Sequence, residues 1–135
     1  MYHNILVPIA FEAERDVSGP LKLARLLATP GARITLLHVV EHIPAYAVSY
    51  IPPDYMIEMR KGLQADLDAK AADLPNAKGV LIEGHAGRSI LDWAEVNKPD
   101  LIIVASHRPG MQDLLLGSTA AKIVRHAPCA VHVVR

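Results

Sequence analysis

Apolar residues along the chain fall into five short runs of the kind that form buried β-strands. The runs cover residues 5–9, 33–40, 78–83, 100–105 and 130–134. The fourth is an almost unbroken apolar stretch, which is typical of a central strand covered on both faces, and the third is the weakest of the five.

Between these runs, apolar residues recur every three or four positions, the spacing of an amphipathic helix. The spacing predicts helices over residues 20–28, 54–73, 89–96 and 118–126. Pro30-Gly31, Pro99 and Pro128 follow three of these segments and stop them. Alternating strands and helices require right-handed crossovers, so the sequence predicts one α/β domain over residues 1–135, an open parallel sheet with helices on both faces.

Composition and charge narrow the classes of partner. The chain has 135 residues, of which 51% are hydrophobic, enough for one well-buried core. Lys and Arg (14) balance Asp and Glu (14), and no basic stripe breaks that balance, so we expect no nucleic-acid partner. No apolar stretch approaches the roughly 20 residues that span a bilayer, and the amino terminus does not resemble a signal peptide. We therefore expect a cytoplasmic protein with no membrane partner.

Cysteine and histidine contribute little chemistry that can be assigned from sequence. Cys129 is the single cysteine, so an intrachain disulfide is impossible, and its apolar surroundings predict a buried small hydrophobic residue rather than a redox centre. The pairs His38 with His42 and His126 with His132 lack the compact cluster that a zinc site needs. We predict no metal site made of protein ligands alone and no catalytic residue.

Ligands of open α/β sheets bind beyond the carboxyl ends of the strands, where the strand order reverses. The loop at 105–119 lies at such an end, and Gly117-Ser118-Thr119 opens the helix that follows it. The N–H groups and dipole of a helix start can hold a phosphate; alternatively, Ser118 is only an N-cap and Gly117 only a turn residue. The loop is not a P-loop, and the first strand–helix turn lacks G-x-G-x-x-G, which disfavours a dinucleotide.

Several stretches together resemble the universal stress proteins, and the resemblance covers the whole chain. Residues 4–8, 36–40 and 84–91 resemble the family's first two strands and its third junction, and the closing stretch at 115–129 is the most specific. Nucleotide-binding members carry G-x-x-G, nine residues and then G-[ST] after the fourth strand. The resemblance implies a Rossmann-like, adenine nucleotide alpha hydrolase-like sheet in the order 3-2-1-4-5, with two helices on each face.

The chain departs from the family pattern at two places. Ala105 and Arg108 stand where the first two glycines would be, and only eight residues separate Arg108 from Gly117. Residues 106–109, Ser-His-Arg-Pro, resemble a subgroup of small bacterial members that retains ATP binding with an altered loop. Ala10 occupies the place where many members have an aspartate near the adenine and ribose.

Each unusual loop residue has more than one interpretation. Arg108 either reaches a phosphate, which suits a guanidinium, or pairs with Asp113. His107 is either a packed histidine, a phosphate ligand or a general base. Gly110 allows the rebuilt loop to turn tightly.

The resemblance implies a site for ATP or another adenine nucleotide, with Mg²⁺ accompanying a triphosphate. We expect the adenine near the ends of the first two strands and the phosphates around the loop at 105–119. The predicted cofactor-binding residues are Pro8, Ile9, Ala10, Val39, Val40, Ala105, Ser106, His107, Arg108, Gly110, Gly117, Ser118 and Thr119. The implied output is nucleotide-dependent regulation of a stress response, with slow ATP hydrolysis at most. The alternatives are a nucleotide-free partner-binding protein, and an ATPase or nucleotidyl transferase that uses His107 or Ser118.

Two further expectations concern the surface. The connection from Glu41 to Pro53 is too long for a minimal turn, and it either covers a ligand or partner or is an ordered surface loop. The last strand, residues 130–134, lies at a sheet edge, which favours pairing with its copy in a homodimer.

Overall fold

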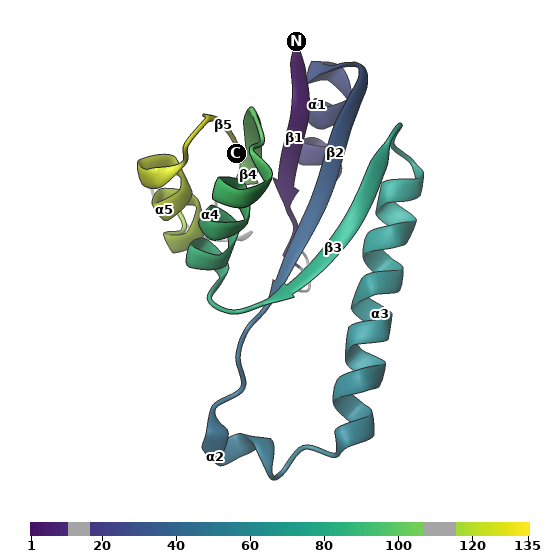
Figure 1. Cartoon of the computed structure of the whole chain (residues 1–135), viewed down its shortest axis with the longest axis vertical. Coiled ribbons are helices and arrows are strands. Elements are labelled where there is room, and N and C mark those ends of the chain that lie inside the picture. The colour runs from purple at the N-terminus through teal and green to yellow at the C-terminus, as the bar shows by residue number, and fades with distance from the viewer. Residues whose placement is uncertain (11–16, 107–115) are drawn as a thin grey trace.

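The structure, a computed structural model, describes residues 1–10, 17–106 and 116–135. Strands and helices alternate along the chain as the hydrophobic pattern predicts (Figure 1). The elements are β1 (Tyr2–Pro8), α1 (Ser18–Leu27), β2 (Ala28–Val40), α2 (Ala45–Val48), α3 (Pro53–Ala72), β3 (Ala77–Glu83), α4 (Ala86–Asn97), β4 (Leu101–Ala105), α5 (Ser118–His126) and β5 (Ala130–Val134).

The five strands form one parallel sheet in the order β3-β2-β1-β4-β5, which confirms the predicted order. Ile5 of β1 pairs with Ile34 of β2 on one side and with Leu101 of β4 on the other. The chain therefore moves outward from β1 in one direction through β2 and β3, and in the other direction through β4 and β5. The reversal point between β1 and β4 is where this class of sheet places ligands.

Side chains alternate between the two faces of the sheet and build two hydrophobic cores. On one face Ile5 and Val7 pack in a cluster with Ala24 of α1 and Leu67 of α3. On the other face Leu6 packs in a cluster with residues of α4 and α5. The predicted arrangement of two helices on each face is confirmed, and it explains why β4 and the buried part of β1, residues 5–7, are continuously apolar.

β2 and α4 both begin earlier than predicted. β2 begins at Ala28, five residues early, and its pairing with β1 shifts between Tyr2 and Asn4, where Gly31 takes up the irregularity at φ +83°. α4 begins at Ala86, three residues before the predicted start at Ser89, because its first turn contributes little apolar periodicity.

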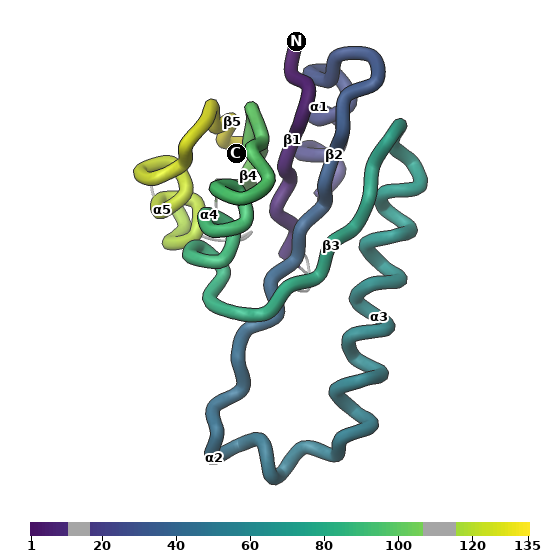
Figure 2. Tube along the Cα trace, in the orientation of Figure 1, coloured from purple at the N-terminus to yellow at the C-terminus, as the bar shows by residue number. Residues whose placement is uncertain are grey.

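The connection between β2 and α3 also differs from expectation, because it contains a short helix, α2. This connection extends away from the sheet before α3 runs back beside β3 (Figure 2). Several of its apolar side chains are exposed, Tyr46 and Tyr50 most of all.

A hydrogen-bonded cluster fastens the amino end of β1 to the segment before β4. The Asp100 carboxylate accepts the backbone N–H groups of His3 and Asn4 at 2.9 and 3.0 Å. The Asn4 side chain donates to the carbonyls of Asn97 and Lys98, both at 3.0 Å, at the end of α4. Burial raises the pKa of Asp100, but these backbone hydrogen bonds outweigh it and leave the pKa below its ordinary value of 3.8.

Cys129 is half-buried rather than buried, and it packs against the cluster under α4 and α5. Burial, and secondarily the negative charge of Asp100, raise the pKa of the thiol. The predicted role as a small hydrophobic residue agrees with this packing. Within the described part of the chain, no helix has the length and hydrophobicity needed to cross a membrane.

Candidate functional site

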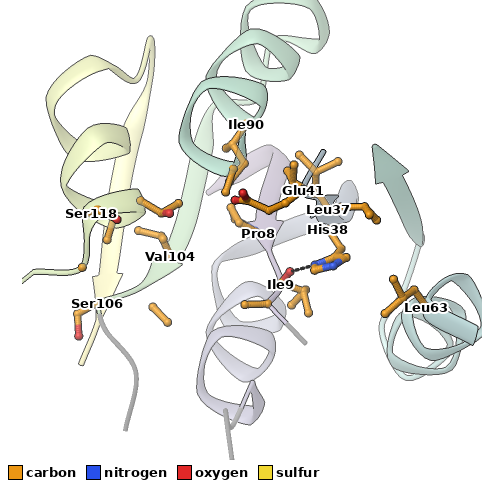
Figure 3. A pocket seen from close by; sticks show the side chains of 18 of the residues that line it. Pro8, Ile9, Leu37, His38, Glu41, Leu63, Ile90, Val104, Ser106 and Ser118 are labelled. Carbon is orange, nitrogen blue, oxygen red and sulfur yellow. Dashed lines mark hydrogen bonds between the residues drawn. The ribbon is translucent and has the colours of Figure 1, made fainter. Parts of the chain in front are cut away.

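A cavity of about 830 Å³ opens at the carboxyl edge of the sheet. The ends of β1, β2 and β4 form its floor, and residues of α3, α4 and α5 form its walls (Figure 3). This volume lies within the range of small-molecule sites, and the position includes the reversal point of the strand order. The cavity is therefore the candidate functional site.

The predicted site residues that the structure describes all line this one cavity. They are Pro8, Ile9, Ala10, Val39, Val40, Ala105, Ser106, Gly117, Ser118 and Thr119. The strand order brings them together, because it places the exits of β1, β2 and β4 side by side with the start of α5. His107, Arg108 and Gly110 lie outside the described residues, as does Asp113, the alternative partner of Arg108.

Other lining residues were not predicted as part of the site. They are Leu37, His38, Glu41, Met59, Leu63, Ala86, Ile90, Val104 and Ala120. Most look like ordinary core or helix positions in the sequence, and only the path of the chain shows that α3 and α4 reach the carboxyl edge. Glu41 is different, because it directly follows a predicted strand and therefore stands at a position where ligands bind.

The start of α5 forms the polar end of the cavity. Gly117 is the N-cap residue, with an extended backbone (φ −60°, ψ 155°), and no side chain caps the helix within the described residues. The alternative interpretation of Ser118 as the N-cap is therefore wrong, since Ser118 is already helical. Gly117 N–H donates to the Ser106 carbonyl at 2.6 Å, and the first intrahelical bond runs from Ala121 N–H to the Gly117 carbonyl at 2.8 Å.

This geometry leaves the first-turn N–H groups of α5, and the hydroxyls of Ser118 and Thr119, at the edge of the cavity. Such groups attract negative charge, and the helix dipole adds to the effect. α4 also starts at the cavity, with His85 as an N-cap residue that makes no side-chain cap hydrogen bond among the described residues. The chemistry of this end of the cavity suits an anion such as a phosphate.

His38 fixes the backbone at the floor of the cavity. Its Nδ1 lies 2.7 Å from the Ile9 carbonyl, which can only accept, so Nδ1 carries the proton (Figure 3). Ile9 N–H in turn donates to the Leu37 carbonyl at 2.8 Å. The segment that follows β1 is thus hydrogen-bonded to β2 through both the N–H and the carbonyl of Ile9.

His42, which follows β2, and Glu83 at the end of β3 form a small ion-pair network with Arg60. Glu83 accepts from Arg60 of α3 at 2.7 Å and contacts His42 Nδ1 at 3.0 Å. The hydrogen bond from Arg60, then that from His42, hold the pKa of Glu83 below its ordinary value of 4.5. Among the described residues no group of three or more His, Cys, Asp or Glu side chains is placed to hold a metal ion.

Comparison with known proteins gives consistent results over the full length. The model of the universal stress protein family matches residues 1–135. A universal stress protein A homolog from Coxiella burnetii is 33% identical over 141 residues, covering 99% of this chain and 95% of the relative. A universal stress protein from Thermus aquaticus is 30% identical over 142 residues, with both chains fully covered.

Solved structures agree with the fold. The universal stress protein UspA from Lactobacillus plantarum superposes with a TM-score of 0.72 at 26% identity, covering 99% of this chain and 98% of that protein. Two more distant members carry nucleotides: an Arabidopsis thaliana protein with AMP bound (TM-score 0.64, 20% identity, 98% and 90% covered) and an Archaeoglobus fulgidus protein in complex with dAMP (TM-score 0.65, 16% identity, 99% and 98% covered). On the strength of the full-length family match and these relatives, the chain belongs to the universal stress protein family.

Proposed function

We propose that this protein binds an adenine nucleotide in the cavity at the carboxyl edge of the sheet. The observation that carries the proposal is the polarity of the cavity. Leu63 of α3 lies toward one end, and Ser118 at the start of α5 lies toward the other (Figure 3). A nucleotide has the same polarity, with a flat apolar base at one end and phosphate at the other.

The residues present fit such a ligand. The volume of about 830 Å³ is large enough for a nucleotide, since drug-sized ligands occupy sites of about 300–1,000 Å³. Apolar side chains from β1, β2 and α3 offer the surface on which a purine packs, and the first turn of α5 offers N–H donors for phosphate oxygens. The relatives with AMP and dAMP bound show that this fold accommodates adenine nucleotides.

The finer parts of the proposal come from the sequence. We propose ATP as the ligand, with Mg²⁺ bound through the phosphates, because Arg108 adds a positive charge to the loop that precedes α5. Nucleotide-dependent regulation of a stress response in the cytoplasm is the corresponding role. Binding rather than turnover is its basis.

The test is calorimetric titration with ATP, AMP and adenosine, using a matched pair of variants at the start of α5. Ser118→Asp places a negative charge where the phosphate would lie, yet a carboxylate in the first helical turn is compatible with the helix dipole, so the fold tolerates it. Ser118→Asn is the neutral control of similar size. We expect Ser118→Asp to weaken ATP and AMP binding by roughly tenfold or more relative to Ser118→Asn, because close like charges at a phosphate site cost several kcal/mol.

Adenosine, which has no phosphate, should bind the two variants equally. Equal ATP affinities for Ser118→Asp and Ser118→Asn would contradict the placement of the phosphates. A wild-type protein that binds none of the three ligands would contradict the proposed function itself.

We also propose that the protein forms a homodimer through β5. Among the described strands β5 pairs only with β4, so its other edge offers unpaired backbone groups. Antiparallel pairing with its own copy would satisfy them in a two-fold arrangement. Light scattering at micromolar concentration should give twice the chain mass of 14.7 kDa, and a monomeric mass would exclude the dimer.

A further inference from the structure

Glu41 is the single charged residue among the described residues that line the cavity. It directly follows β2, and within the described part of the chain its carboxylate makes no ion pair or side-chain hydrogen bond. In Figure 3 this carboxylate points into the site, between the labelled side chains of Pro8 and Ile90, rather than away from it. A carboxylate at such a position affects any ligand that enters.

The charge of Glu41 restricts how a nucleotide can lie. An ionised carboxylate accepts hydrogen bonds and cannot donate them, and it repels phosphate. The part of the ligand beside Glu41 must therefore carry hydrogen-bond donors and no negative charge. The phosphates must lie away from it, toward the N–H groups at the start of α5.

The position of Glu41 between the two ends of the cavity indicates which part of a nucleotide would lie beside it, namely the sugar. Leu63 marks the apolar end and Ser118 the anion-binding end, and the Glu41 carboxylate lies between them in Figure 3. The middle portion of a nucleotide is its ribose, whose hydroxyls are donors. Dinucleotide-binding sheets use the same chemistry, an acidic residue that accepts from the ribose 2′-hydroxyl.

We propose that Glu41 is a specificity-determining residue that accepts a hydrogen bond from the 2′-hydroxyl of the bound nucleotide and so selects ribonucleotides over deoxyribonucleotides. This inference rests on the proposed nucleotide-binding function. It adds a recognition element that the apolar walls and the helix starts cannot supply, because neither distinguishes a hydroxyl from a hydrogen on the sugar.

The experiment compares AMP with 2′-deoxy-AMP by calorimetry on wild type, Glu41→Ala and Glu41→Gln, with EDTA present to remove divalent metal. Glu95→Gln on α4 is the control, because Glu95 is exposed and does not line the cavity. Glu41 is exposed too, so its variants should fold normally. We expect wild type and Glu95→Gln to prefer AMP by roughly 10- to 100-fold, the range for a hydrogen bond to a charged group.

In Glu41→Ala the preference for AMP over 2′-deoxy-AMP should fall to about twofold or less. The fall should come from weaker AMP binding, with the affinity for 2′-deoxy-AMP unchanged or improved. Glu41→Gln should retain part of the preference. Tight AMP binding by wild type with the same preference in Glu41→Ala would overturn this inference and leave the proposed function intact. A Glu41→Ala variant that instead loses discrimination between AMP and inosine monophosphate would overturn it as well, since Glu41 would then contact the base. An effect seen only for ATP with Mg²⁺ would identify a metal ligand and would also overturn it.

Discussion

Replacing Gly79 by alanine is expected to destabilise the fold, because α3 crosses β3 too closely for a side chain at this position. A Cβ atom added to Gly79 would lie 2.6 Å from the Leu67 Cβ and 3.2 Å from the Leu67 backbone carbonyl carbon. Neither atom is the end of a flexible side chain. Leu67 is fully buried in the core, and Gln64 of α3 donates to the Gly79 carbonyl at 3.1 Å, so helix and strand are fastened together at this point.

The magnitude follows from the separation that the new methyl group would require. Carbon atoms pack at about 3.5–4.0 Å, so α3 would have to move about 1 Å away from the sheet. Overpacking of this kind typically costs about 1–3 kcal/mol. Alanine in a strand regains about 0.5–1 kcal/mol of the entropy that glycine loses on folding. The central values of these two ranges leave a net loss of about 1 kcal/mol in the free energy of unfolding.

Gly62, within α3, provides the matched control. Nothing lies within 4 Å of a Cβ atom added there, and the residue is exposed. Gly62→Ala should therefore stabilise the protein by about 1 kcal/mol, the helix-propensity difference. Urea denaturation followed by circular dichroism would measure both variants, with unchanged m-values showing that the comparison is of native-state stability. A Gly79→Ala variant as stable as wild type, or stabilised as much as Gly62→Ala, would show that α3 does not cross β3 this closely at Gly79.

Two other predictions concern carboxylates outside the cavity. Asp100→Ala should destabilise the fold at neutral pH by about 1–2 kcal/mol, because two backbone N–H groups lose a charged acceptor. The pKa of Asp100 is lowered in the folded state, so the stabilisation by its carboxylate is complete above the ordinary value of 3.8 and is lost as the pH falls through the folded-state pKa. The urea midpoints of wild type and Asp100→Ala should therefore converge in acid. A difference in midpoint that does not change with pH would contradict this explanation. For Glu83, Arg60→Ala should raise the carboxyl pKa toward 4.5 more than His42→Ala does, as measured by NMR titration, and the reverse order would show that His42 is the stronger partner.

The fold could be predicted from the sequence because its signals are local and agree with one another. The apolar runs at β1, β2 and β4 and the helix stops at Pro99 and Pro128 appear directly in the chain. Errors arose where non-local contacts decide the structure. The early start of β2 depends on pairing between Tyr2 and Ala28 across the bulge at Gly31, and no pattern within residues 28–32 indicates a strand.

The candidate site was predictable where it consists of strand ends and a helix start. Ser106, Gly117 and Ser118 follow from the rule that ligands bind at the carboxyl edge. Met59 and Leu63 could not be assigned to a cavity from their spacing, because the same helical stripe would serve equally well as a buried core. Their role depends on the long β2–α3 connection, which carries the first half of α3 beyond the sheet (Figure 1).

Ala10, where the resemblance to the family implies an aspartate in many members, and Glu41 are linked by geometry. Ala10 follows β1, Glu41 follows β2, and these two strands are neighbours, so both residues line the same cavity. A carboxylate at the end of either strand would therefore line the same cavity, away from the start of α5 where the phosphates are proposed to bind. On this argument Ala10→Asp in the Glu41→Ala background should restore part of the preference for AMP over 2′-deoxy-AMP, measured by calorimetry in EDTA. Failure of the double variant to recover any preference would show that the two positions are not interchangeable around the sugar.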